Sequence, residues 1–139
     1  MTATPRALEL LQIAARAADS KQADDLVALD VSGPLPLTDV FLLASGRNER
    51  NVLAIAGEVE DALIEAGAKP LRREGRSEGR WVLLDFGDLV VHVFHDEDRQ
   101  YYSLERLWSD CPVLPLDVVG ESGADTDTAA AGAPASTDA

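Results

Sequence analysis

The chain has 139 residues, of which 46% are hydrophobic, enough for one domain with a buried core. Twelve basic residues against 25 acidic ones give a net charge of −13, which disfavours general binding to nucleic acid, because such binding rests on contacts of cations with phosphates. A single cysteine, Cys111, excludes an internal disulfide and a multi-cysteine zinc site. Without a leader pattern or an apolar stretch near the ~20 residues that span a bilayer, we expect a cytoplasmic protein with no membrane partner.

The first predicted elements are a helix and two strands. Thr4 before Pro5 marks a helix start, and the helix should cover residues 5–19, with an apolar face formed by Leu8, Leu11, Ala15 and Ala18. The short apolar segments "DLVALDV" (25–31) and "DVFLLAS" (39–45) predict strands. The Gly and Pro residues of "SGPLPLT" between them indicate a loop.

A second helix and three more strands follow. Residues 47–66 place one apolar face on Val52, Ile55, Ala56, Val59 and Leu63, and Gly67 and Pro70 end this helix. "PLRRE" predicts a short edge strand, and "EGRSEG" a polar loop. "RWVLLD" (80–85) and "DLVVHVF" (88–94) predict two further strands, and "DEDRQYYSLERLW" (96–108) a closing helical segment.

This order of elements predicts an α/β fold, with a mixed sheet of about five strands and helices packed against it. The continuous apolar runs indicate central strands that are covered on both faces. From Gly120 onward the chain has no Leu, Ile, Val or aromatic residue, so we expect residues 1–119 to form a single domain and residues 120–139 a disordered acidic tail. The tail contains four acidic and no basic residues, which leaves residues 1–119 with a charge of −9.

The hairpin "WVLLDFGDLVVHVF" (81–94) carries polar residues in an apolar setting. Its "D-F-G-D" predicts a two-residue turn in which Gly87 takes a positive φ. Turn chemistry is the simpler interpretation of Asp85 and Asp88, because a metal pair needs carboxylates on one face of a strand, as Asp-x-Asp provides. Strand alternation puts His92 in one row with Val90 and Phe94, where a histidine is more often a hydrogen-bonded structural residue than a ligand.

No complete catalytic or cofactor-binding pattern is present, so we expect neither an enzyme nor a bound cofactor or metal. The turn "ASGRNER" (44–50) between a strand and a helix could hold an anion on its backbone amides, but helix capping is the simpler interpretation. Walker, Gly-x-Ser-x-Gly and His-Glu-x-x-His sequences are missing. The alternative is a nucleotidyltransferase-like or metal-dependent enzyme that uses the Ser45-Gly46 turn with Asp85 or His92.

Four segments together resemble the ribosomal silencing factor family, RsfS, also called Iojap-like. They are "DLVALDV", "LTDVFLLASGRNER", "EGRSEGRWVLLDFGDLVVHVF" and "RQYYSLERLW", and the resemblance covers roughly residues 5–112. The chain departs from the family pattern at Asn51, where Gln or His is expected after the Arg. The resemblance implies a fold related to nucleotidyltransferases but without their catalytic carboxylates.

The resemblance also implies a function. Such a protein binds the large ribosomal subunit through ribosomal protein L-fourteen, blocks joining of the small subunit and so represses translation. The acidic balance agrees with docking onto a basic ribosomal protein, and sequence-specific binding of nucleic acid is not expected. A third hypothesis is a homodimer of the free protein, in which one apolar face serves both self-association and docking.

The hairpin supplies the candidate docking residues. A two-residue turn at Phe86-Gly87 places Asp85 opposite Asp88 and Trp81 opposite His92. A Trp beside a His, with charged and aromatic residues nearby, is typical of a binding hot spot. The alternative is that Trp81 packs beneath the second helix as a core residue. We assign the ribosomal-protein contact to Glu74, Trp81, Asp85, His92, Arg99 and Tyr102.

Overall fold

The fold is that of a computed structural model, which describes residues 3–35, 37–102, 106 and 108–118. Its elements are α1 (Pro5–Ser20), β1 (Asp24–Asp30), β2 (Val40–Gly46), α2 (Glu49–Glu65), β3 (Arg72–Glu74), β4 (Trp81–Asp85), β5 (Leu89–His95), α3 (Asp96–Tyr102) and β6 (Val113–Leu114). Every element predicted up to residue 95 is present, with ends shifted by one or two residues. The predicted tail (120–139) lies outside the described residues, as does part of the closing helical segment.

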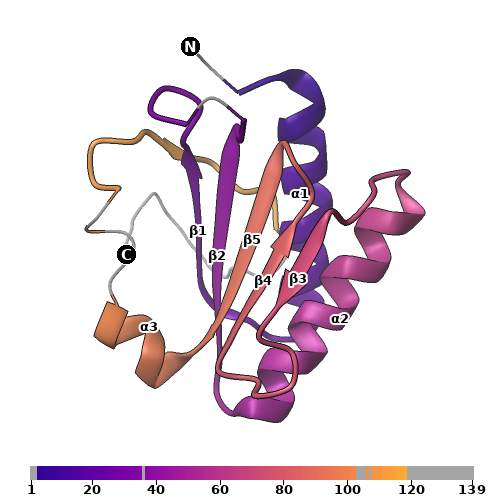
Figure 1. The fold of residues 1–139 in the computed structure, drawn as a ribbon, viewed down its shortest axis with the longest axis vertical. Helices are drawn as coiled ribbons and strands as arrows, with labels where there is room; N and C mark the ends of the chain where they lie inside the picture. Colours follow the sequence, from indigo (N-terminus) through magenta and orange to yellow (C-terminus); the bar gives the residue numbers. More distant parts are fainter. Residues whose placement is uncertain (1–2, 36, 103–105, 107, 119–139) are drawn as a thin grey trace.

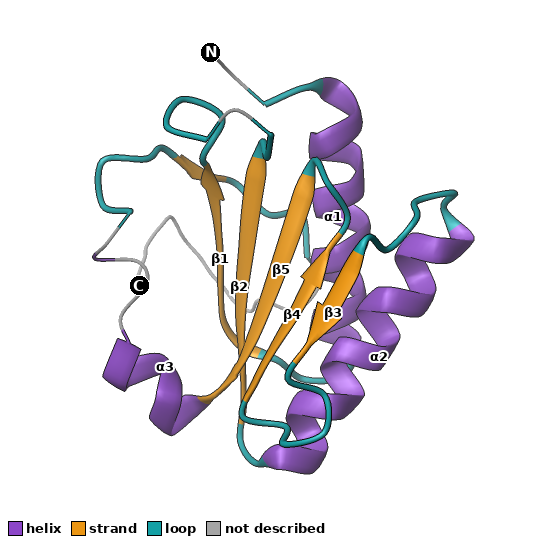
Figure 2. Ribbon diagram, in the orientation of Figure 1, coloured by secondary structure: helices purple, strands orange, loops and turns teal. Residues whose placement is uncertain are grey.

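The strands form one mixed sheet in the order β3-β4-β5-β2-β1-β6 (Figures 1 and 2). The central strands β2 and β5 pair in parallel, and the other neighbouring strands pair antiparallel. The predicted mixed α/β fold is therefore confirmed. One strand was missed: β6 has only two residues and pairs with β1 through Ala28 and Leu29.

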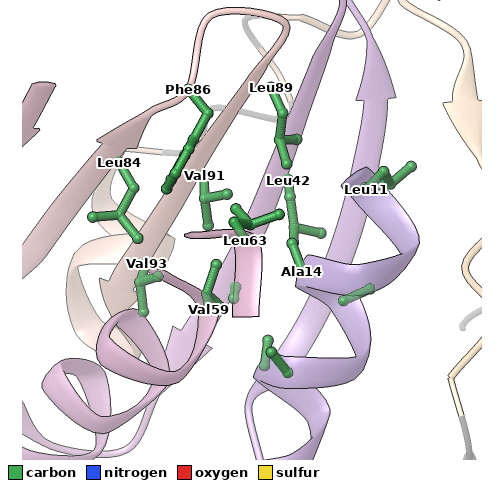
Figure 3. Close-up of a cluster of buried hydrophobic side chains, with 14 of the residues drawn as sticks. Leu11, Ala14, Leu42, Val59, Leu63, Leu84, Phe86, Leu89, Val91 and Val93 are labelled. Atoms are coloured by element: carbon green, nitrogen blue, oxygen red, sulfur yellow. The ribbon is translucent and has the colours of Figure 1, made fainter. Parts of the chain in front are cut away.

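Helices α1 and α2 pack side by side against one face of the sheet, which we call the helical face. Helix α1 begins as the sequence predicts, because the side chain of Thr4 accepts a hydrogen bond from the Ala7 amide. Helix α2 begins two residues later than predicted, because the side chain of Asn48 caps it by accepting a hydrogen bond from the Asn51 amide. In Figure 3, strand residues such as Leu42, Leu84 and Val93 and helix residues such as Leu11, Ala14, Val59 and Leu63 lie together in one aliphatic cluster.

The opposite face, which we call the aromatic face, has a second apolar cluster. Its buried residues are Leu29, Val31, Phe41, Leu43, Val90 and Phe94, and Trp81, Leu83 and Trp108 pack against them. Helix α3 lies at one end of this face, where Arg99 donates a hydrogen bond of 2.9 Å to the Ser45 hydroxyl. Strands β2 and β5 are buried along their whole length, which confirms that both of their faces are covered.

Candidate docking surface

The β4–β5 hairpin closes one residue later than the sequence suggested. The Phe86 amide donates to the Leu89 carbonyl at 2.9 Å, so Gly87 and Asp88 form the tip, and Gly87 has φ +85°. Phe86 belongs to the helical-face cluster and is 7% exposed. Burial of this ring keeps Phe86 in the paired part of the strand, since a position at the tip would leave it in water.

The pairing of the hairpin is therefore shifted by two residues from the predicted one. Trp81 lies opposite Phe94, and Leu83 lies opposite His92, so the expectation that Trp81 pairs directly with His92 and Asp85 with Asp88 was wrong. A shift of two leaves every side chain on its predicted face. Trp81 and His92 are consequently diagonal neighbours, and the indole Nε1 donates a hydrogen bond of 3.2 Å to Nδ1 of His92.

Four of the predicted docking residues share the aromatic face. Trp81, Leu83 and Asp85 alternate along β4, and Glu74 lies opposite Leu83 on the edge strand β3. His92 lies on β5, on the other side of Leu83. Trp81 packs with Phe94 at a centroid distance of 4.8 Å, in the cluster opposite α2, so it is not a core residue beneath that helix.

Two residues of this surface were missed by the sequence argument. Leu83 is half-buried between Trp81 and Asp85, and its spacing of two from each was the available signal. Arg72 lies opposite Asp85 on β3, with its Nε 3.3 Å from Glu74 and a terminal nitrogen 3.9 Å from Asp85. We call Arg72, Glu74, Trp81, Leu83 and Asp85 the docking strip.

The remaining predicted residues come from α3. Arg99 is 6% exposed and its guanidinium binds the Ser45 hydroxyl, so it ties α3 to the sheet. Tyr102 is the last residue of α3, but its side chain lies outside the described part of the structure.

Arg80 is a second tie between α3 and the body of the protein. Its guanidinium donates two hydrogen bonds, of 2.9 and 3.1 Å, to the carboxylate of Asp98. It also reaches Glu97 at 3.3 Å and Glu49, at the start of α2, at 3.4 Å. The structure thus fixes the start of α3 next to the docking strip.

His92 is buried behind Trp81, between aromatic rings. It is 5% exposed, and its ring centroid lies 4.9 Å from that of Phe41 in an edge-on arrangement. Burial lowers the pKa of His92 to about 4, so the imidazole is neutral at pH 7. Because Nδ1 accepts from Trp81, the proton is on Nε2, and Nε2 has no hydrogen-bond partner among the described residues.

The polar groups of the enzyme alternative have structural roles. One carboxylate oxygen of Asp85 accepts from the Gly87 amide at 2.9 Å, as expected of a turn aspartate. Asn48 caps α2, and a Cβ on Gly46 would lie 2.8 Å from the Val52 amide, so the 44–50 turn is built for close packing. In the part of the chain that the structure describes, no three His, Cys, Asp or Glu side chains could hold a metal ion.

Asn51, the departure from the family pattern, also has a defined structural role. Its side chain accepts from the Arg47 amide at 3.0 Å and donates to the Lys21 carbonyl at 3.1 Å. It therefore joins the β2–α2 turn to the end of α1.

Among the described helices, none is long and apolar enough to cross a membrane.

The chain is similar in sequence and in fold to known proteins. It matches the family described as "Ribosomal silencing factor during starvation" over residues 4–139. It is 48% identical to ribosomal silencing factor RsfS of Bacillus subtilis, over 78% of this chain and 92% of the relative. A crystal structure from Bacillus halodurans superposes with a TM-score of 0.70 at 46% identity, over 78% of this chain and 99% of that one.

A more distant relative has a related name. The "mitochondrial assembly of ribosomal large subunit protein 1" of Mus musculus is 28% identical over 64% of this chain and 40% of the mouse protein. Together with the match to the family along nearly the whole chain, these relatives show that the protein belongs to the RsfS family of ribosomal silencing factors.

Proposed function

We propose that this protein is a ribosomal silencing factor that binds the large ribosomal subunit through ribosomal protein L-fourteen. In the bound state its volume keeps the small subunit from joining, and translation falls. This mechanism needs an affinity and an occupied volume, and no catalysis. The names of the relatives support it: the Bacillus subtilis protein is called a ribosomal silencing factor, and the mouse protein is named for the large subunit.

The observation that carries the proposal is the docking strip. Trp81 and Leu83 are half-buried and give it an apolar centre, while the exposed Glu74 and the half-buried Asp85 put carboxylates beside them. Binding sites combine these properties, because a desolvated aromatic residue supplies affinity and a charged rim supplies orientation. The net charge of −13 complements a basic ribosomal protein and speeds encounter with it.

Co-sedimentation with isolated large subunits tests this function, with and without small subunits present. Trp81→Ala should weaken binding at least about tenfold, since truncation of a hot-spot aromatic costs on the order of 2 kcal/mol. Ile64→Ala is the matched control, because Ile64 is an apolar residue of α2 that is 45% exposed. A folded Trp81→Ala variant that binds and blocks subunit joining like the parent would show that the strip is not the docking surface.

The salt dependence of binding gives a second test. We expect added salt to weaken the complex without abolishing it at moderate ionic strength, because salt screens the carboxylates but not the apolar contact of Trp81 and Leu83. An affinity that does not change with salt would contradict charge-guided docking.

Two alternatives can be separated by simple measurements. An enzyme that uses the Ser45-Gly46 turn would bind a nucleotide or a divalent metal saturably, and this binding would be lost in Ser45→Ala or Asp85→Ala. Homodimerisation through the aromatic face would appear in sedimentation of the free protein, and large subunits would compete with it.

A further inference from the structure

The geometry points to His92 as a positioning residue of the docking surface: we infer that it holds the indole of Trp81 ready for the partner and makes no contact with the partner itself. This inference rests on the proposed function. It assigns distinct tasks to two residues that the sequence placed together, with Trp81 as the contact and His92 as its support.

The two rings differ in burial. His92 is 5% exposed, whereas Trp81 is half-buried at the outer side of the same cluster. A partner that lands on the docking strip therefore reaches the indole first. The imidazole lies behind it, next to Phe41 and Phe94.

A hydrogen bond joins the two rings. Indole has a single donor, Nε1, and imidazole in this tautomer offers a single acceptor, Nδ1. The 3.2 Å bond between these atoms fixes the direction in which the indole N–H points. Together with the contact of Trp81 on Phe94 at 4.8 Å, it selects one orientation of the ring. An anchor that is already oriented loses less freedom when it binds.

The other side of the imidazole carries Nε2. Nε2–H is buried and has no hydrogen-bond partner among the described residues, and such a group destabilises the folded state. A leucine at this position would fill a similar volume in the apolar cluster without that cost. The imidazole at this position is therefore explained by the acceptor that it offers to Trp81, and not by stability.

Substitution of His92 should have opposite effects on stability and on docking. His92→Leu should keep or raise the melting temperature, yet weaken co-sedimentation with large subunits about fivefold, the scale of one hydrogen bond. His92→Asn, whose side-chain oxygen can take the place of Nδ1, should recover most of the affinity. A purely structural histidine would show the reverse for Leu, with lower stability and unchanged affinity of the folded protein.

A double-mutant cycle tests whether the two rings act together. Trp81→Phe keeps an aromatic ring and removes the N–H, so it should weaken binding about as much as His92→Leu does. If the hydrogen bond is the cause, the double variant should bind no more than about twofold weaker than either single variant. Losses that multiply would show that the two residues act independently, and would overturn the inference.

Tryptophan fluorescence gives a readout that does not depend on the ribosome. The chain has two tryptophans, so in a Trp108→Phe background the signal comes from Trp81 alone. His92→Leu should increase quenching of that signal by acrylamide, because the indole is held less firmly. His95→Leu is the control, since His95 is also buried on β5 but accepts its hydrogen bond from the Glu97 amide.

The outcomes separate the inference from the function on which it rests. If Trp81→Ala abolishes binding while His92→Leu binds and quenches like the parent, the docking surface stands and the positioning role is wrong. If Trp81→Ala binds like the parent, the docking surface itself is wrong, and the positioning role falls with it.

Discussion

The two faces of the sheet differ in their share of aromatic side chains. The helical face is mostly Ala, Val and Leu, many of them fully buried, as are Leu42, Val59 and Leu63. The aromatic face brings together Phe41, His92 and Phe94 with the partly exposed Trp81 and Trp108. Aliphatic groups need only volume and burial, whereas an indole or imidazole also has a polar atom that needs a partner. The first face therefore serves folding, and the second suits a surface that another molecule covers.

The largest expected effect is a loss of stability from a cavity on the helical face. Leu63 is fully buried between α2 and the sheet, and Leu63→Ala should lower the free energy of unfolding by about 4 kcal/mol. Urea titration measures this change. The folded fraction should still bind large subunits with the affinity of the parent, and a specific loss of binding would break the division of tasks between the two faces.

Low pH should destabilise the protein through His92, which is buried on the aromatic face. Because the pKa of His92 is about 4 in the folded chain and 6.5 when unperturbed, the folded state favours neutral imidazole. The contribution of neutral His92 to the free energy of unfolding is complete above pH 6.5. It decreases by about 3 kcal/mol as the pH drops from 6.5 to 4.

Urea titrations across that range measure this loss for the parent and for His92→Leu. The variant should lack this part of the acid dependence. Equal acid dependence in the two proteins would assign the loss to other groups.

Glu60 is a polar exception on the helical side of the molecule. It is 5% exposed and forms ion pairs with Arg73 of β3 and with Arg76 at 2.8 Å, so its charge is satisfied. Glu60→Ala should lower stability by about 2 kcal/mol. Glu9→Ala removes the exposed pair with Arg6 and should change it by under about 0.5 kcal/mol. Equal losses of stability in thermal melts of the two variants would show that burial does not strengthen the ion pairs of Glu60.

The smallest effect is expected from removal of residues 120–139. Truncation after Val119 removes a segment without apolar anchors, so the affinity for large subunits should stay within about threefold, or ~0.7 kcal/mol. Co-sedimentation of the shortened chain measures this. A hundredfold loss would identify the segment as a further contact.

Local patterns were sufficient for most of the fold. Period-two and helical spacings, with Thr4 as a cap and Gly67 as a stop, located the elements up to β5 within one or two residues. Strand β6 has two residues and no pattern of its own, because its pairing with β1 depends on where the chain returns in space. Such non-local information is not contained in a short window of sequence.

The arrangement of the hairpin residues was predicted in part, and the contact between Trp81 and His92 was inferred from a wrong strand register. Trp81 and His92 were expected to be directly opposite, but Phe86 packs into the core and moves the turn by one residue. The contact between Trp81 and His92 is still made, because a shift of two residues leaves both side chains on the same face of the sheet. Residues that are diagonal neighbours across two strands are close enough for their rings to touch. Arg72 and Leu83 were missed because each is recognised only once the strand pairing is known.

The parallel pairing of β2 with β5 also constrains how the chain folds. These two strands form the centre of the sheet, yet α2, β3 and β4 lie between them in the sequence. Pairs so distant along the chain form late, because the entropy of closing the loop must be overcome before the contact contributes. During synthesis, therefore, the first half of the protein would leave the ribosome with β2 still lacking its parallel neighbour, and the sheet could close only after β5 had followed.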